Sequence, residues 1–292
     1  MDSPARVQLR ASPSTLWRSF RTAAWLGWQI ESNWADPLVF VVYSVSRPLA
    51  LALILVAVYW AVSAQATAAE RFLGFFVANA FHAYVMNVAI GLGWVVVEER
   101  EEYETLRSLI VAPMGMFAYF TGRGLVRLAT ATLSTVLTLT VGWFLLHQRW
   151  DWSLVRWAPL ALAYVLGLVA TMGFGFLAAG FGLLLPRVSI TVNEGVTVLL
   201  YLLCGVTFPI DLLPHGLQEL ALLIPFTWWY EALRRFLLGT GASARLGALS
   251  DGALLLGLAV TTAAFVVLGR WGYRALENRA RALGRIDQTT LF

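Results

Sequence analysis

The side chains in this sequence that could act in catalysis or bind a metal are few, and they lie far apart. His82, His147 and His215 are widely separated, and the single cysteine, Cys204, lies within an apolar run. No Cys/His cluster has metal-ligand spacing, and no G-x-S-x-G motif marks a nucleophilic serine. All 21 basic residues are arginine, so the chain lacks the lysine of a phosphate-binding P-loop. The sequence therefore excludes a P-loop ATPase and has no pattern typical of an enzyme.

One short segment does concentrate ionisable groups. Directly after an apolar run, the chain reads Glu98, Glu99, Arg100, Glu101, Glu102, Tyr103 and Glu104. Five carboxylates within seven residues cannot enter hydrocarbon. The next residues predict a short amphipathic helix with the stripe Leu106, Leu109 and Ile110, ending near Pro113. Such an apolar knob flanked by charges suits docking into a partner's groove, and the spacing fits a solvated loop equally well.

The elements that position this segment must be membrane helices. Hydrophobic residues make up 59% of the 292 residues and charged residues only 13%, far from the composition of a soluble domain. A spanning helix needs about 20 mainly apolar residues. Six such runs are predicted, at residues 38–62, 72–97, 117 or 125–146, 157–184, 195–209 and 254–271. The fold class is therefore an all-α membrane protein with six transmembrane helices.

An even number of spans places both termini on one side of the membrane. Arginines precede the first span, follow the second and fourth, and end the chain, and this bias predicts cytoplasmic termini. The first 30 residues contain no continuous apolar core before a small-residue cleavage site, so no cleaved signal peptide is expected.

A different kind of helix is predicted before the first span. Aromatic residues recur there at Trp17, Phe20, Trp25 and Trp28, with Pro13 suited to the first turn. Trp rings and interspersed arginines are typical of a helix that lies in the membrane interface. The alternative is a helix on the soluble side that packs against the bundle.

The region from residue 205 to residue 240 is apolar but broken. Pro209, Pro214 and Pro225 each remove a backbone donor and interrupt a helix. Two short helices are predicted, at about 215–224 and 227–238, with Gly239 as the stop. Broken backbone is tolerated at membrane depth where protein or a water-filled cavity covers it. Residues 207–240 are therefore predicted to form a re-entrant hairpin from the extracellular surface, with Phe208, Glu231 and Arg234 among its gate residues.

Three polar residues within the spans are candidates for a transport pathway. Arg47 lies beside Pro48 in the first span, and Asn79 and His82 share a face of the second. Arg47 can equally snorkel or pair with a carboxylate, and polar side chains in a bundle are often only interhelical hydrogen-bonding groups.

Two of these regions together resemble a known family. Glu99-Arg100-Glu101-Glu102, followed by Thr105-Leu106, Leu109 and Pro113, is similar to the E-R-E-E-G-T-L-x-x-L-x-x-x-P signature of ABC-2 type transporter permeases. Tyr103-Glu104 replaces the usual Gly with one residue extra, and Arg107 stands where Glu is frequent. Gly205 to Pro209, Leu213-Pro214, Leu223 to Phe226 and Glu231 to Arg234 resemble the family's second pattern in order and spacing. The likeness covers nearly the whole chain.

This resemblance implies a function and partners. The family's permeases pair as two six-helix subunits, so a second copy or a related permease is expected. The segment 98–113, including Glu104 and Arg107, would be the coupling helix that contacts a separate ATPase subunit, and ATP and magnesium are expected on that subunit alone. The resemblance implies an exporter in the inner or plasma membrane of a bacterium or archaeon. Lipid is the expected environment, and no nucleic-acid partner is expected.

The predicted organisation is an N-terminal segment with the interfacial helix (1–36), the transmembrane domain (37–272) and a basic cytoplasmic tail (273–292). An ion-coupled secondary transporter and a non-transporting membrane scaffold are the alternatives. The core of spans one to four contains no Asp or Glu to bind a coupling ion, and no inverted repeat of three spans is evident. Both observations favour the ATP-dependent permease.

Overall fold

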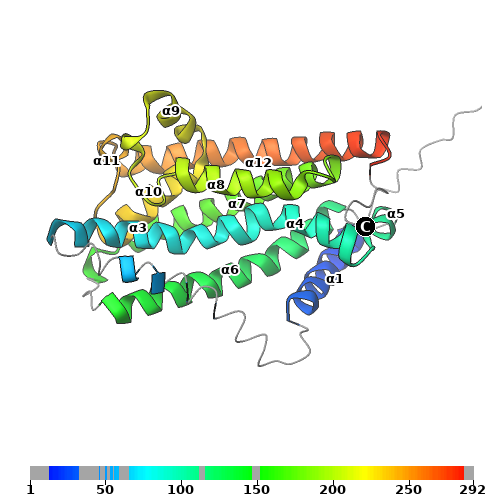
Figure 1. Cartoon of the computed structure of the whole chain (residues 1–292), viewed down its shortest axis with the longest axis horizontal. Coiled ribbons are helices and arrows are strands. Elements are labelled where there is room, and N and C mark those ends of the chain that lie inside the picture. The colour runs from blue at the N-terminus through cyan, green and yellow to red at the C-terminus, as the bar shows by residue number, and fades with distance from the viewer. Residues whose placement is uncertain are drawn as a thin grey trace, which may run out of the picture.

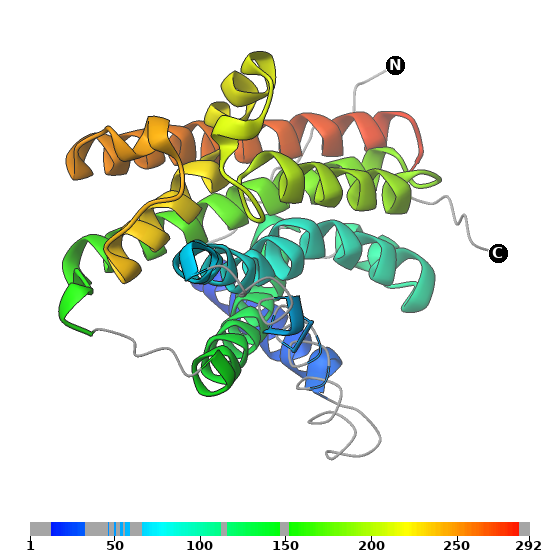
Figure 2. The ribbon, with the colours of Figure 1, turned by 60° about the vertical axis from the view of Figure 1, so that its left-hand side comes forward.

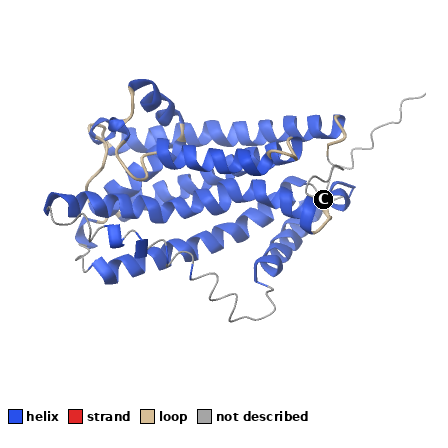
Figure 3. Cartoon of the chain, in the orientation of Figure 1, coloured by secondary structure: helices blue, strands red, loops and turns tan. Residues whose placement is uncertain are grey.

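The chain folds as a bundle of long helices (Figure 1). The computed structural model describes residues 13–32, 46, 50, 53, 54, 56–58, 66–111, 116–146 and 152–285. Every regular element within these ranges is a helix (Figure 3). The prediction of an all-α protein is confirmed.

Four of the described helices are long and apolar enough to cross a membrane. They comprise Phe72–Glu102, Met116–Leu145, Trp157–Leu184 and Asp251–Ala282. These are the second, third, fourth and sixth predicted spans. The second and sixth run beyond their predicted ends at Val97 and Trp271, because charged residues end the part of a helix that suits hydrocarbon without ending the helix itself.

The other two predicted spans have different outcomes. The first, residues 38–62, lies mostly outside the described residues. In place of the fifth, 195–209, the structure has α8 (Ser189–Leu203), which is 15 residues long. The prediction placed both ends of this helix too late. Its polar first turns are helical rather than loop, and it stops before Gly205, whose left-handed φ of 73° breaks the helix.

The second long helix is continuous but changes its winding twice. It comprises α3 (Ala66–Tyr84), the π-helical η1 (Val85–Ile90), α4 (Gly91–Val97) and the π-helical η2 (Glu98–Glu102). A π turn closes over one residue more than an α turn. The two halves also have different neighbours: α3 packs against α6 (Met116–Leu146) and α10 (Pro225–Leu238), whereas α4 packs chiefly against α7 (Trp157–Leu184).

The centre of the bundle is α7. It packs along α12 (Asp251–Ala282), the most extensive contact between two helices in the described chain, and the two helices remain adjacent when the view is turned (Figure 2). Gly173 and Gly269 meet at this contact, where a methyl group on Gly269 would overlap the Gly173 carbonyl. Glycine at these two positions therefore permits the close approach of the two helices.

The broken region forms two short helices. After α8 come the 3₁₀ turn η4 (Ile210–Leu212), α9 (His215–Leu223), α10 and α11 (Ala244–Gly247). Pro214 immediately precedes α9, Pro225 begins α10, and Gly239 ends α10 with a φ of 76°. The predicted pair of helices is confirmed to within two residues, because proline and glycine fix where such helices start and stop.

The remaining described elements lie at the ends of the bundle. α1 (Pro13–Ser32) packs against α6, α5 (Leu106–Val111) follows η2, and the 3₁₀ turn η3 (Trp152–Leu154) precedes α7. α1, α5 and the end of α12 lie at one end of the bundle, and α9 and α11 lie at the other (Figure 1). The two candidate functional regions are therefore far apart.

Candidate functional site

The first region, residues 98–111, is called here the coupling segment. Its backbone turns sharply between η2 and α5: the Tyr103 amide donates to the Glu98 carbonyl and the Thr105 amide to the Glu99 carbonyl, both at 2.9 Å. Glu104 completes the turn with a left-handed φ of 52°, the one positive φ of a non-glycine residue in the described chain. This is the place where the related signature carries glycine.

Glu98 ties the coupling segment to α6. Its two carboxylate oxygens accept from the guanidinium groups of Arg123, at 2.7 Å, and Arg127, at 2.6 Å. Arg127 also lies 3.7 Å from Glu31 near the end of α1. Three separate parts of the chain thus share one network of charges.

Glu99 is buried, with 2% of its side chain exposed. It accepts hydrogen bonds from the hydroxyls of Tyr119 and Thr105, and the Nε atom of Arg123 lies 3.8 Å away. A buried carboxylate needs such partners, because an unpaired charge in the interior is costly. The interpretation of this segment as a solvated loop is therefore wrong for Glu99.

Arg100 is also buried, and it caps the C-terminal end of α7. Its guanidinium donates to the carbonyls of Gly182, at 3.0 Å, and Leu183, at 3.3 Å. Arg285 donates to the next carbonyl, Leu184, at 2.8 Å. The last carbonyls of a helix have no intrahelical partner and carry the negative end of its dipole. Two arginines from distant parts of the chain therefore stabilise this one helix end.

Two residues of the predicted apolar stripe, Leu106 and Leu109, face inward. Leu106 is 2% exposed and belongs to a core cluster with Val95, Tyr119 and Phe120, while Leu109 packs partly against the same cluster. Leu106 is therefore not the tip of an exposed knob. Among residues 98–109, whose burial the structure describes, the exposed ones are polar or aromatic: Glu102, Tyr103, Glu104, Thr105, Arg107 and Ser108. Glu101 is half-buried, and Pro113 lies outside the described residues.

Sequence reasoning missed Arg123, Arg127 and Tyr119, which bind the charges of the coupling segment. Arg123 and Arg127 lie one helical turn apart in an otherwise apolar helix. Arginines at that spacing in a membrane helix need acidic or hydrogen-bonding partners, so the pair in the sequence could have indicated that this helix binds nearby carboxylates.

The left-handed turn at Glu104 leads to a prediction. Glu104→Gly is expected to raise the free energy of unfolding by about 0.5–1 kcal/mol, because a side chain at positive φ is strained and glycine is not. Glu104→Ala removes the charge but keeps the strain, so its stability should stay near that of the wild type. Thermal unfolding of the purified variants measures both, and an equal gain in the two would show that the charge is responsible.

The predicted interfacial helix, α1, has two unlike faces. Trp17, Trp25 and Trp28 are exposed, and Phe20 is half-buried and stacked on Trp17 with ring centroids 5.5 Å apart. The opposite face carries small residues and packs closely on α6, where Ala23 is buried beside Gly122. The helix therefore packs on the bundle and presents its tryptophans outward.

The second region is the hairpin, and its buried centre is the pair Glu231 and Arg234, each 2% exposed. Arg234 donates to the carbonyls of Gly74, at 2.9 Å, Gly205, and Val206, at 3.2 Å. Glu231 accepts from the amides of Ala242, at 2.9 Å, and Ser243, at 3.2 Å. The pair, whose nearest atoms are 3.7 Å apart, thus holds α10 against α3 and against both flanking loops.

The exposed rim of the hairpin is held by further charges. Asp211 accepts from the amides of Ala244, at 2.7 Å, and Arg245, at 3.3 Å, and so caps α11. Arg245 pairs with Glu219 of α9 at 2.8 Å, and this hydrogen bond lowers the pKa of the Glu219 carboxyl. Of the predicted gate residues, Phe208 and Pro209 are half-buried, Pro214 is exposed and Pro225 is buried.

The candidate pathway residues are engaged inside the bundle. Asn79 donates to the hydroxyl of Tyr201, and Nδ1 of His82 lies 2.8 Å from the hydroxyl of Tyr230. The ring of His82 also meets the edge of Tyr201, with centroids 5.0 Å apart. These contacts link α3 to α8 and α10, as interhelical hydrogen bonds would. Arg47 lies outside the described residues.

Comparison with known proteins agrees with this arrangement. The profile of the ABC-2 type transporter family matches residues 18–238, which include most of α1, the coupling segment and most of the hairpin. A search of curated proteins gave no match. The family match spans most of the chain and, with the apolar helices, identifies a multi-pass permease of ABC-type transporters. The chain therefore belongs to the ABC-2 type transporter family.

Proposed function

We propose that this permease is powered by a separate ATPase subunit that docks on the coupling segment, and that it exports its substrate. The observation that carries the proposal is the anchoring of the coupling segment. Glu98 and Glu99 bind α6, Arg100 binds the end of α7, and the polar side of the segment stays exposed. A segment held this firmly transmits a push on its exposed side to two transmembrane helices.

In the proposed topology the chain crosses the membrane six times, with residues 38–62 and α8 as the first and fifth crossings. Both termini and the coupling segment are cytoplasmic, in line with the arginine bias. The exposed tryptophans of α1 lie in the membrane interface. The hairpin of α9 and α10 re-enters from the outer surface and shapes the exit.

The proposed mechanism is a shift between two conformations. A second copy, or a related permease, completes the dimer, and each permease carries one ATPase subunit. ATP binding brings the two ATPase subunits together, which favours one arrangement of α6 and α7 over the other. The permease contributes no catalytic residue, because ATP and magnesium are bound by the ATPase subunits.

The docking surface is tested by exchanging charges without changing the net charge. Glu102→Arg combined with Arg107→Glu reverses the pattern on the exposed side of the coupling segment. The variant is expected to retain about tenfold less ATPase subunit, because mispaired charges oppose association. The measurement uses tagged full-length chain purified from its native membrane, with the retained Walker-motif ATPase quantified by mass spectrometry.

A matched control exchanges the charges of a different pair. Glu277→Arg combined with Arg281→Glu reverses an ion pair of 2.7 Å at the end of α12 and keeps the pair intact. This variant should retain the ATPase as the wild type does. Absence of any Walker-motif ATPase from the wild-type sample, or equal retention by both exchanged variants, would refute the docking proposal.

A further inference from the structure

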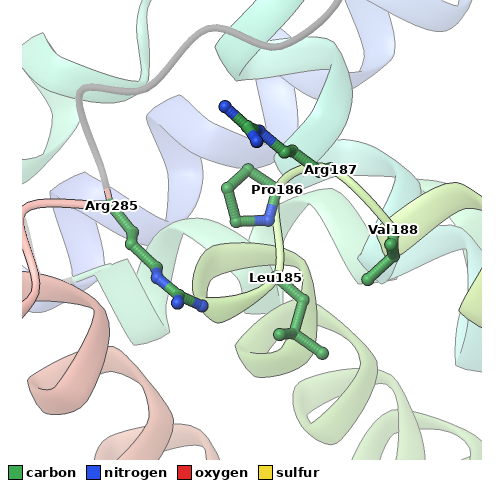
Figure 4. A pocket seen from close by; sticks show the side chains of 5 residues that line it. All are labelled: Leu185, Pro186, Arg187, Val188 and Arg285. Carbon is green, nitrogen blue, oxygen red and sulfur yellow. The ribbon is translucent and has the colours of Figure 1, made fainter.

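A pocket lies where α7 ends and α8 begins, next to the end of α12 (Figure 4). Its lining residues are Leu185, Pro186, Arg187, Val188 and Arg285. The two arginines stand on either side of Pro186 (Figure 4). The pocket is at the same end of the bundle as the coupling segment, since Arg100 binds the carbonyls of Gly182 and Leu183 just before it.

The two guanidinium groups give the pocket a positive charge. Arg285 is oriented by its hydrogen bond to the Leu184 carbonyl, at 2.8 Å, which uses one of its five N–H donors. Arg187 is exposed. Within the part of the chain that the structure describes, no carboxylate lies within 4.0 Å of either guanidinium. The charge of the pocket is therefore not neutralised by a described acidic side chain.

The backbone adds to this preference for an anion. Val188 lines the pocket and is also the residue that precedes the first turn of α8, where no side chain caps the helix. The N–H groups of a helix N-terminus and its positive dipole end favour a negative charge. Two arginines and a helix N-terminus thus converge on one pocket, and both kinds of group bind phosphate oxygens well.

We propose that this pocket binds a phosphate group, with Arg187 and Arg285 as its charged ligands. The rest of the wall is Leu185, Pro186 and Val188, and this apolar surface favours the headgroup of an anionic phospholipid over free phosphate. A bound headgroup would join the end of α12 to the start of α8. It would do so beside the helix end that Arg100 caps.

The test measures lipid binding to the purified full-length chain in detergent. Phosphatidylglycerol is titrated into the wild type and into the variant Arg187→Gln/Arg285→Gln, and bound lipid is counted by native mass spectrometry. The matched control, Arg274→Gln/Arg279→Gln, removes the same charge from exposed positions of α12. The pocket variant is expected to bind phosphatidylglycerol about tenfold more weakly, because it has lost charge-assisted hydrogen bonds. The control is expected to bind the lipid as the wild type does.

Equal binding by the wild type and both variants, or an equal loss in both variants, would overturn the proposal. Thermal unfolding checks that the variants are folded. Competition with inorganic phosphate separates the two sources: displacement of the lipid by equimolar phosphate would identify a site for free phosphate, and its persistence would identify a lipid site. The measurement needs no ATPase subunit, so its failure would leave the proposed function unaffected.

Discussion

Arg234→Met is expected to lower the free energy of unfolding by about 3–5 kcal/mol, the usual cost of removing one partner of a buried ion pair. Methionine retains an unbranched apolar side chain in place of the aliphatic part of arginine but has no N–H donors. The variant therefore leaves the carbonyls of Gly74, Gly205 and Val206 without their guanidinium, and Glu231 buried without a compensating charge. Unfolding of the purified chain in detergent, followed by tryptophan fluorescence, measures the effect.

Arg245→Met is the matched control in the same hairpin. Arg245 is 43% exposed and pairs with Glu219, which is 49% exposed, at 2.8 Å. Pairs so accessible to solvent contribute little to stability, because water screens their charges. Equal destabilisation by the two substitutions would contradict the assignment of Arg234 as the buried anchor of the hairpin.

Arg100→Gln is expected to reduce permease-dependent ATP hydrolysis by about tenfold, within the usual range of a coupling free energy between sites. This expectation rests on the proposed function. The substitution removes the cation that joins the coupling segment to the Gly182 and Leu183 carbonyls, so a push on the segment no longer reaches α7. The measurement is the ATP hydrolysis rate of the reconstituted complex, relative to that of the ATPase subunit alone.

Loss of stability must be separated from loss of this contact. Gly269→Ala is the comparison, because the added methyl group crowds α7 against α12 and overpacking costs about 1–3 kcal/mol. It leaves the contacts of Arg100 in place. Hydrolysis should stay near the wild-type rate in Gly269→Ala, and an equal fall in both variants would attribute the effect to stability.

The positions of the helices were largely predictable from the sequence. Composition and the length of apolar runs identified the four long described helices, and proline with glycine fixed α9 and α10. These signals are local, since each depends on a few neighbouring residues. The start of α8 was predicted too late because its first turns are polar, which resembles a loop in a search for apolar runs.

The partners of the candidate residues were not predictable. The motif identified Glu99 and Arg100, but their hydrogen bonds go to Tyr119 in one helix and to Gly182 and Leu183 in another. The sequence of an amphipathic helix also does not determine whether its apolar side packs against a partner protein or against its own chain. Leu106 faces the chain's own core, and only the folded structure decides between those two.

The π-helical segment η1 determines where the second long helix tolerates the loss of a residue. One residue advances an α-helix by about 100° around its axis. Because a π turn contains one residue more than an α turn, deleting a residue between 85 and 90 is absorbed by a return to α-helical winding. Deleting a residue within α4 instead would rotate Glu98, Glu99 and Arg100 away from the groups that bind them. Volume-conserving exchanges among the buried apolar residues of η1 cost less than about 1.5 kcal/mol, whereas a change in the number of residues within α4 displaces the contacts of the coupling segment that follows.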